Sequence, residues 1–323
     1  MLKRLSALFV VLLLLAGWWT MPPSLVSPTA DSQLSGNVEA ALAAGERRVA
    51  ERYGLIEGAE KRLRWHAAKG TQTEYAVVYL HGFSGSRQEI APVPEMVADT
   101  LGANLFETRL SGHGHRSEAL AGTRAEDWLA DGVEALAVGQ ALGRRLVVIG
   151  TSTGASLALA LAEHPRFAAI DTLILLSPNH GPRDPASVWL TRPFGPQIAR
   201  ALVGEYRGFE PANERQALFW STRYPTAALV EMMRLVDLAN AKTPAARVPK
   251  ALLMYSPEDR VVSVDKLLAA FEALPAAVKA SYAMESTDDP GQHVLAGDIL
   301  APANNVEVAE RISSFVRSGQ ALP

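Results

Sequence analysis

Cysteine is the most informative absence from this chain of 323 residues, which contains 0 cysteines. Without cysteine the protein forms no disulfide, zinc–thiolate site or iron–sulfur cluster, and it has no cysteine nucleophile. A surplus of positive charge is also lacking, because 31 Lys and Arg residues stand against 34 Asp and Glu residues. The formal net charge of −3 gives a nucleic-acid-binding surface no electrostatic support, so we expect no nucleic-acid partner.

Nucleotide-binding glycine motifs are missing as well. Neither G-x-G-x-x-G nor G-x-x-x-x-G-K-[ST] occurs between a strand-like and a helix-like segment. The sequence therefore predicts no cofactor and no metal. Apolar residues make up 48% of the chain and charged residues 20%, a composition that excludes disorder over the whole length.

The N-terminus has the composition of a targeting segment. Lys3 and Arg4 precede an apolar run over residues 5–19 that ends in two tryptophans. This order predicts a signal peptide or membrane anchor over residues 1–20, and the lack of a clear cleavage site favours an uncleaved anchor. We expect the protein to be membrane-anchored or secreted, with its functional domain on the non-cytoplasmic, periplasmic side. A buried N-terminal helix of a cytosolic protein is the alternative.

From residue 61 onward, short apolar runs alternate with longer segments of helical periodicity. The runs that predict strands are residues 75–80, 103–110, 146–150, 173–177, 251–255 and 280–284. The segments that predict helices are residues 93–101, 125–142, 153–164, 264–274 and 304–317. This alternation is typical of an α/β fold with a mostly parallel, doubly wound sheet. Active sites in such sheets lie at the carboxyl ends of the strands.

One interval between strands, residues 179–249, is far longer than an ordinary crossover. We expect it to form a helical cap over the site, with an extra core layer as the alternative. The side chains of the cap that we expect to bind substrate are Trp189, Trp220, Met232 and Met233. The predicted core is then residues 61–178 and 250–318, preceded by a linker and N-terminal helix over residues 21–60.

The sharpest motif is Gly150-Thr-Ser-Thr-Gly154, which has the form G-x-S-x-G. It follows a predicted strand directly and precedes a predicted helix. A turn this tight leaves no room for side chains at its flanks, and it lifts the hydroxyl of Ser152 above the edge of the sheet. The motif predicts that Ser152 is a nucleophile.

A serine nucleophile needs a base, and the base needs an orienting acid. His293 follows the last predicted strand and is the expected base, with His180 as its rival. Asp259 lies in the turn after the predicted strand 251–255 and is the expected acid. The neighbouring Glu258 is the alternative acid.

An oxyanion hole needs two convergent backbone N–H groups. The residue after the nucleophile, Thr153, is expected to supply one of them. The loop after the first buried strand reads His81-Gly-Phe-Ser-Gly85, and Phe83 is expected to supply the other, with Ser84 as the alternative. We expect His81 to hydrogen-bond to neighbouring loops rather than to act as a base.

Together these motifs resemble the α/β-hydrolase superfamily over about residues 61–317. The stretches that carry the resemblance are His81-Gly82-Phe83, Leu110-Ser-Gly-His-Gly114, Asp127-Trp128, Gly150-Thr-Ser-Thr-Gly154, Ser256-Pro-Glu-Asp259 and Gln292-His293. Among its members the chain most resembles the monoacylglycerol lipase and carboxylesterase group, which carries a cap before the acid. The usual Pro before the Gly-His-Gly stretch is Ser111 here, and both variable positions of the serine motif are Thr.

The resemblance implies a serine hydrolase that cleaves carboxylic esters of apolar acyl chains through an acyl-enzyme. Ser152, Asp259 and His293 would form its triad, and a small apolar ester would be its substrate. A serine aminopeptidase or amidase on the same fold is the alternative, and a non-catalytic scaffold is the third candidate. The aminopeptidase needs an acidic group for the substrate amine, which the cap offers at Glu205, Glu210, Glu214 and Glu231.

Overall fold

The computed structural model describes residues 37–115 and 119–320. The predicted signal peptide or membrane anchor, residues 1–20, lies outside the described residues. In the part that is described, no helix is both long and apolar enough to cross a membrane. The first described helix, α2 (Val38–Tyr53), begins at an Asn37 side chain that accepts the Ala40 N–H, and it ends at Gly54 in the left-handed region (φ 69°).

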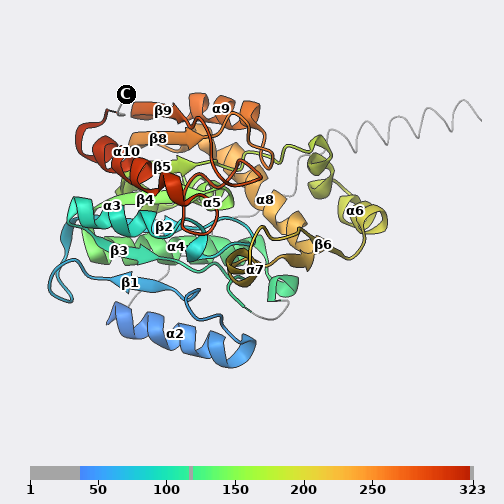
Figure 1. Ribbon diagram of the computed structural model, residues 1–323, viewed down its shortest axis with the longest axis horizontal. Helices are drawn as coiled ribbons and strands as arrows, with labels where there is room; N and C mark the ends of the chain where they lie inside the picture. The colour runs from blue at the N-terminus through green and yellow to red at the C-terminus, as the bar shows by residue number, and fades with distance from the viewer. Residues whose placement is uncertain (1–36, 116–118, 321–323) are drawn as a thin grey trace, which may run out of the picture.

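A seven-stranded sheet forms the centre of the described chain, in the order β1-β3-β2-β4-β5-β8-β9 (Figure 1). Its strands are β1 (Arg62–Arg64), β2 (Thr73–Leu80), β3 (Asn104–Glu107), β4 (Gly143–Thr151), β5 (Ile170–Leu176), β8 (Val248–Tyr255) and β9 (Ala276–Ala283). Only β1 runs antiparallel to its neighbour within this sheet. The predicted α/β class with a mostly parallel sheet is confirmed.

Apolar side chains of the strands alternate between two core layers, as the pleat requires. In β2, Ala76 and Val78 belong to one layer, whereas Val77 and Tyr79 belong to the other. The first layer is completed by α4 (Ala125–Leu142), α5 (Thr153–Ala160), α8 (Thr226–Lys242) and α9 (Val264–Ala273). The second layer is completed by α3 (Val93–Leu101) and α10 (Asn305–Ser318). Helices therefore cover both faces of the sheet.

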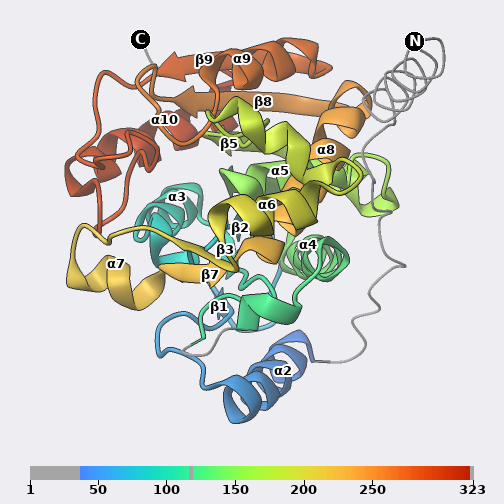
Figure 2. The same cartoon turned by 90° about the vertical axis from the view of Figure 1, so that its right-hand side faces the viewer.

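Between β5 and β8 the chain leaves the sheet and forms the segment that the sequence predicts as a cap. Its elements are η4 (Pro185–Thr191), α6 (Gly195–Val203), β6 (Tyr206–Gly208), α7 (Glu214–Phe219), β7 (Arg223–Pro225), α8 and η5 (Thr243–Ala245). The strands β6 and β7 pair antiparallel in a small sheet of their own. Figure 2 looks onto this side of the molecule and shows α6 in front of α5 and α8.

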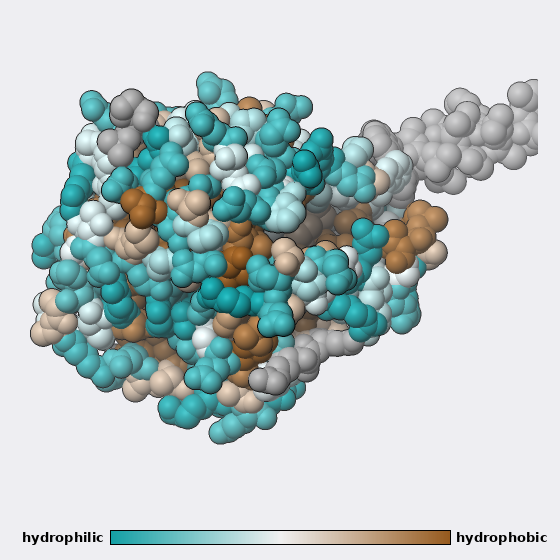
Figure 3. Space-filling model, viewed as in Figure 1, coloured by the Kyte–Doolittle hydropathy of each residue, from teal (hydrophilic) through white to brown (hydrophobic). Residues whose placement is uncertain are grey.

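The helix α6 turns an apolar face outward. Phe194, Ile198 and Leu202 follow one another at a spacing of four residues, and Leu202 is 80% exposed. Figure 3 shows brown, hydrophobic atoms at the right-hand edge of the molecule, where α6 lies in Figure 1. This face of the segment between β5 and β8 is therefore in solvent rather than in the core.

The structure differs from the predicted elements at a few places. The helix predicted over residues 153–164 ends at Ala160, because Pro165 disfavours helical backbone at His164, which is extended (ψ 137°). The strands β1, β6 and β7 have three residues each and were not predicted. Runs this short are below the length at which a period-2 pattern can be recognised.

Candidate active site

Ser152 lies in the turn that joins β4 to α5, and its backbone is strained there (φ 51°, ψ −118°). The flanking glycines are required by space. A Cβ on Gly154 would lie 2.1 Å from the Leu80 carbonyl oxygen, and one on Gly150 would lie 2.6 Å from the Ala155 Cα. The Ser152 N–H donates to the Leu176 carbonyl oxygen on β5 (2.8 Å), which fixes the turn to the sheet. This is the geometry that the G-x-S-x-G motif predicts.

Asp259 and His293 meet from two different loops. The Asp259 Oδ2 lies 2.7 Å from the His293 Nδ1, and both side chains are buried. The other oxygen, Oδ1, accepts the N–H groups of Val261 (2.7 Å) and Val262 (2.9 Å). The carboxylate is thus held by its own turn with one oxygen left for the imidazole. The alternative acid, Glu258, is exposed.

The backbone of His293 is held on both sides. Its N–H donates to the Asp289 Oδ2 (2.9 Å), and its carbonyl oxygen accepts the Ser177 hydroxyl (2.8 Å). Burial opposes the charged imidazole, but the hydrogen bond to Asp259 and the charges of Asp259, Glu89 and Asp289 outweigh it, so the pKa of His293 is raised. The rival base, His180, points elsewhere, because its Nδ1 bonds the Asn240 Oδ1 on α8 (2.7 Å).

The described residues contain no hydrogen bond between the Ser152 hydroxyl and His293. In free enzymes the contact between nucleophile and base commonly tightens only when substrate is bound. Ser152, Asp259 and His293 nevertheless lie at or after the carboxyl ends of three strands, namely β4, β8 and β9. This edge of the sheet is where the sequence predicts the chemistry.

The loop after β2 presents its peptide groups in a fixed order. The Leu110 N–H donates to the His81 Nε2 (3.0 Å), so the His81 Nδ1 carries the proton and donates to the Gly82 carbonyl oxygen (2.9 Å). This carbonyl and the Phe83 N–H belong to one trans peptide group and point in opposite directions. His81 therefore fixes the direction of the Phe83 N–H. Burial lowers the pKa of His81 to about 4, which keeps the ring neutral.

The next amide in this loop is already engaged. The Ser84 N–H donates to the His113 Nε2 (3.0 Å), and the His113 Nδ1 faces the Ser111 carbonyl oxygen (3.0 Å). Burial holds the pKa of His113 well below its ordinary value, so the ring stays a neutral acceptor. Ser84, the alternative oxyanion donor, is thereby occupied, whereas no hydrogen bond of the Phe83 N–H is found among the described residues. Thr153 is the first residue of α5, where an N–H has no partner within the helix.

Comparisons with known proteins agree with this fold. The model of the alpha/beta hydrolase family matches residues 77–303. The chain belongs to the alpha/beta hydrolase family. It is also similar to the thermostable monoacylglycerol lipase of Bacillus sp. (strain H-257), with 28% identity over 222 residues that cover 66% of this chain and 80% of the relative.

Two solved structures share the α/β-hydrolase fold of this chain. A metagenome-derived lipolytic enzyme matches with a TM-score of 0.66 and 22% identity, over 81% of this chain and 99% of its own. A soluble variant of the monoglyceride lipase of Saccharomyces cerevisiae matches with a TM-score of 0.60 and 13% identity, over 94% of this chain and 100% of its own. The predicted resemblance to the α/β-hydrolases is confirmed.

The four predicted substrate-binding side chains of this α/β-hydrolase fall into two groups. Trp220 is buried, and its Nε1 lies 3.3 Å from where a Cβ on Gly85 would be. Met232 is buried, with its sulfur 3.7 Å from Asn179, whose amide also reaches the Thr153 hydroxyl (3.3 Å). These two therefore lie beside two segments: residues 81–85, which carry the predicted oxyanion donor Phe83 and are called the oxyanion loop below, and the turn of residues 150–154 at Ser152, called the elbow.

No contact with that position is found for the other two among the described residues. Met233 is buried in the core layer with α4 and α5, to which Met232 also belongs, and Trp189 is 37% exposed on η4. Tyr224, on β7, was not predicted, yet its ring packs edge-on against the Phe83 ring at a centroid distance of 5.1 Å. The segment between β5 and β8 also contacts the oxyanion loop through its backbone, because the Ser221 N–H donates to the Ser84 carbonyl oxygen (2.7 Å).

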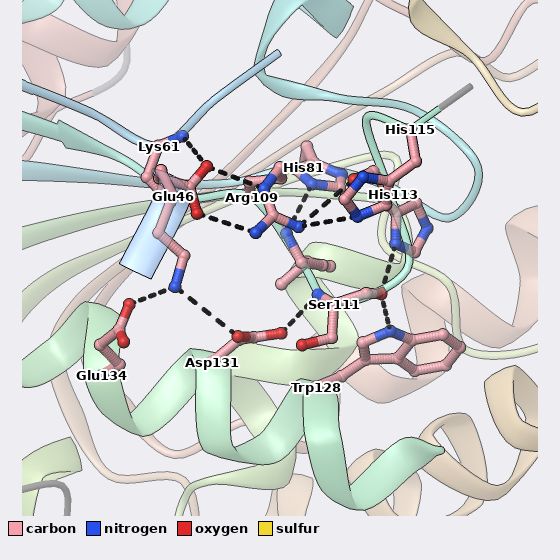
Figure 4. A network of polar contacts seen from close by, with 11 residues as sticks. Glu46, Lys61, His81, Arg109, Ser111, His113, His115, Trp128, Asp131 and Glu134 are labelled. Atoms are coloured by element: carbon pink, nitrogen blue, oxygen red, sulfur yellow. Dashed lines mark hydrogen bonds and ion pairs between the residues drawn. The ribbon is translucent and has the colours of Figure 1, made fainter. Parts of the chain in front are cut away.

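A buried polar network joins α2 to His113, the residue that accepts the Ser84 N–H (Figure 4). Glu46 on α2 accepts two hydrogen bonds from the Arg109 guanidinium (2.8 and 2.9 Å). Arg109 continues to the His113 carbonyl oxygen (3.4 Å) and to the His115 Nε2 (3.3 Å). The helix before the family-matched region is thus fastened to the residue that anchors Ser84.

Ser111 gives this network a further hydrogen bond. Its N–H donates to the Asp131 Oδ2 (2.6 Å), which a proline at this position could not do. Its carbonyl oxygen accepts the Trp128 Nε1–H (2.9 Å), and Lys61 lies 3.8 Å from the other Asp131 oxygen (Figure 4). Within residues 37–115 and 119–320, no group of three or more His, Asp or Glu side chains is arranged to hold a metal ion.

Proposed function

We propose that this protein is a carboxylic-ester hydrolase that cleaves esters of apolar acyl chains through a Ser152–Asp259–His293 triad. The observation that carries the proposal is the 2.7 Å contact of the Asp259 carboxylate with the His293 imidazole, in a chain whose Ser152 occupies a strained strand-to-helix turn. The similarity to a monoacylglycerol lipase supports the same reaction class.

The residues would act in a fixed order. The Ser152 oxygen attacks the acyl carbon, and His293 Nε2 takes the hydroxyl proton while Asp259 accepts the hydrogen bond of the Nδ1–H. The N–H groups of Phe83 and Thr153 stabilise the oxyanion of the tetrahedral intermediate. His293 then protonates the departing alcohol, which leaves an acyl-enzyme on Ser152. Water activated by His293 attacks that ester and releases the acid.

Apolar side chains around the oxyanion loop support an apolar acyl group. The Phe83 ring packs with Tyr224 and Trp128, and Trp220 and Met232 lie beside the loop and the elbow. Apolar and polarisable side chains of this kind bind hydrocarbon chains without fixing one length.

The amide-hydrolase alternative receives less support from the cap. Glu205 pairs with Arg200, and Glu231 pairs with Arg234 (2.7 Å) and accepts the Ala125 N–H at the start of α4 (3.1 Å). Two of the four acidic residues expected to hold a substrate amine therefore bind partners within the protein.

We also propose that residues 1–20 hold the domain at a membrane on the non-cytoplasmic, periplasmic side. The basic start followed by an apolar run supports this proposal. Fractionation of cells that produce the full chain should recover the protein in the membrane fraction, and protease added to spheroplasts should digest it. Recovery in the soluble cytoplasmic fraction would overturn the assignment.

The function is tested with the full chain in detergent, on p-nitrophenyl esters from acetate to palmitate and on aminoacyl anilides. We expect ester turnover that rises with chain length beyond acetate. Ser152→Ala should lower kcat by a factor of about 10⁵ or more, since loss of a triad nucleophile costs about that much. Hydrolysis of anilides alone, or ester turnover that survives in Ser152→Ala, would contradict the proposal.

A further inference from the structure

Glu89 is a buried carboxyl group beside the oxyanion loop that the reaction scheme does not use. It ends the short helix η1 (Arg87–Glu89), and its side chain is almost fully enclosed. Its Oε2 accepts the Gly82 N–H (2.7 Å) and the Tyr79 hydroxyl (3.0 Å). Gly82 directly precedes Phe83 in the loop after β2, so Glu89 holds the amide immediately before the oxyanion peptide.

Two glycines of the loop make room for this carboxyl group. A Cβ on Gly82 would lie 2.8 Å from the Glu89 Oε1 and 3.2 Å from the Ser152 Cβ. A Cβ on Gly85 would lie 3.2 Å from the same oxygen and 3.3 Å from the Trp220 Nε1. The carboxyl group thus lies in a cradle formed by the loop, close to the nucleophile, with Oε2 on the loop amide.

Charged and titratable groups face Glu89 from two other elements. Tyr79 faces it from β2, and His293 and Asp289 act on it from the loop after β9. Burial raises the pKa of Glu89 to about 7, against the opposing effects of the Gly82 N–H, the Tyr79 hydroxyl and the charge of His293. In turn, the negative charge of Glu89 is one of the influences that raise the pKa of His293.

We propose that Glu89 is a positioning residue with two effects: it fixes the oxyanion loop through the Gly82 N–H, and in its ionised form it acts as a second carboxylate that stabilises the His293 imidazolium formed during the reaction. This inference rests on the proposed ester hydrolysis. Asp259 orients the imidazole by a direct hydrogen bond, whereas Glu89 makes no hydrogen bond with it among the described residues and lies across Gly82 from the Ser152 side chain. Both carboxylates favour the protonated ring, so each helps His293 to accept the proton of Ser152.

The first test separates charge from hydrogen bonding. Glu89→Gln keeps an oxygen that accepts the Gly82 N–H but removes the charge. Without that charge the pKa of His293 falls, so the acid limb of the kcat/KM profile should move to lower pH. The imidazolium is also less stabilised, and kcat at the optimum should fall about three- to tenfold with little change in KM. Glu89→Asp, which restores the charge, should return the acid limb toward that of the unchanged chain.

The matched control is Glu107→Gln. Glu107 is equally buried, and burial raises its pKa to about 7 as well, but its charge partner is Arg62 on the edge strand β1. This variant should leave the acid limb unchanged. An acid limb that stays in place in Glu89→Gln, or moves equally in both variants, would overturn the proposal.

A second measurement does not depend on turnover. The imidazole of His293 can be titrated by NMR in the Ser152→Ala background, with and without Glu89→Gln. We expect the midpoint of His293 to be lower when Glu89 is replaced. An unchanged midpoint would refute the charge effect even if the protein hydrolysed esters, and a lowered one would support it even if the tested esters were not substrates.

Discussion

The oxyanion loop and the segment between β5 and β8 both border Ser152, but they are built by different interactions. In the loop, the Gly82 and Ser84 amides donate to Glu89 and His113, and His81 holds the carbonyl between them. The other segment contributes rings and a sulfur, from Trp220, Tyr224 and Met232. The loop fixes the directions of its amides, and the other segment supplies apolar contact.

This difference separates the two requirements of the reaction. Stabilising an oxyanion needs N–H donors held to within fractions of an ångström, and a buried neutral acceptor such as His113 fixes the loop by holding the neighbouring Ser84 amide. Binding a hydrocarbon chain needs apolar contact without strict direction. Substitutions on the polar side should therefore lower kcat, whereas those on the apolar side should raise KM for long chains. If substitutions in the oxyanion loop and in the apolar segment change kcat and KM in the same way, this distinction is wrong.

The largest effect is expected at Asp259. In Asp259→Asn the amide can no longer hold the imidazole tautomer that accepts the Ser152 proton, so kcat should fall about 10⁴-fold. Urea unfolding of Asp259→Asn, compared with that of the unchanged chain, shows whether the variant is still folded when kcat is lost. Glu258→Gln, next to it but exposed, is the control and should retain full activity. Equal losses in both variants would show that the turn, and not the Asp259 carboxylate, is needed.

A smaller effect is expected at His113. His113→Leu removes the acceptor of the Ser84 N–H and loosens the oxyanion loop, so kcat should fall by up to about 10²-fold while KM changes less. His115→Leu is the matched control, because its Nδ1 has no hydrogen-bond partner among the described residues and its Nε2 only reaches Arg109. Steady-state kinetics should show the loss in His113→Leu alone; a rise in KM with an unchanged kcat would contradict the assignment.

The smallest effect is expected on the apolar side. Trp220→Ala removes a buried ring beside the oxyanion loop, so kcat/KM for long-chain esters should fall about tenfold while that for acetate changes little. Trp189→Ala exchanges the same residue type at an exposed position and should leave both values unchanged. A loss of acetate turnover in Trp220→Ala would mean that this ring supports the loop and does not contact the acyl chain.

The features that were predictable from sequence are local in the chain. The elbow at Ser152 depends on Gly150 and Gly154, and the turn of Asp259 is closed by the N–H groups of its own next residues. Strand and helix periods located the carboxyl edge of the sheet, so Ser152, Asp259 and His293 could be assigned to it.

The features that were missed connect segments far apart in sequence. His113 holds the amide of Ser84 across 29 positions, and Glu46 reaches Arg109 across 63. Asp289 is also buried and accepts the N–H groups of His293 and Val294, a contact that no sequence motif indicates. Nothing in the sequence around Glu89 indicates its contact with Gly82, which only the fold brings about.

The central claim is that Ser152 is the nucleophile, and covalent labelling tests it most directly. The full chain is treated with an alkyl fluorophosphonate and the adduct is located by peptide mass spectrometry. We expect one adduct on Ser152, formed in step with the loss of ester turnover and slowed about as strongly as turnover by Asp259→Asn. An adduct on another residue, or complete inhibition without modification of Ser152, would contradict it.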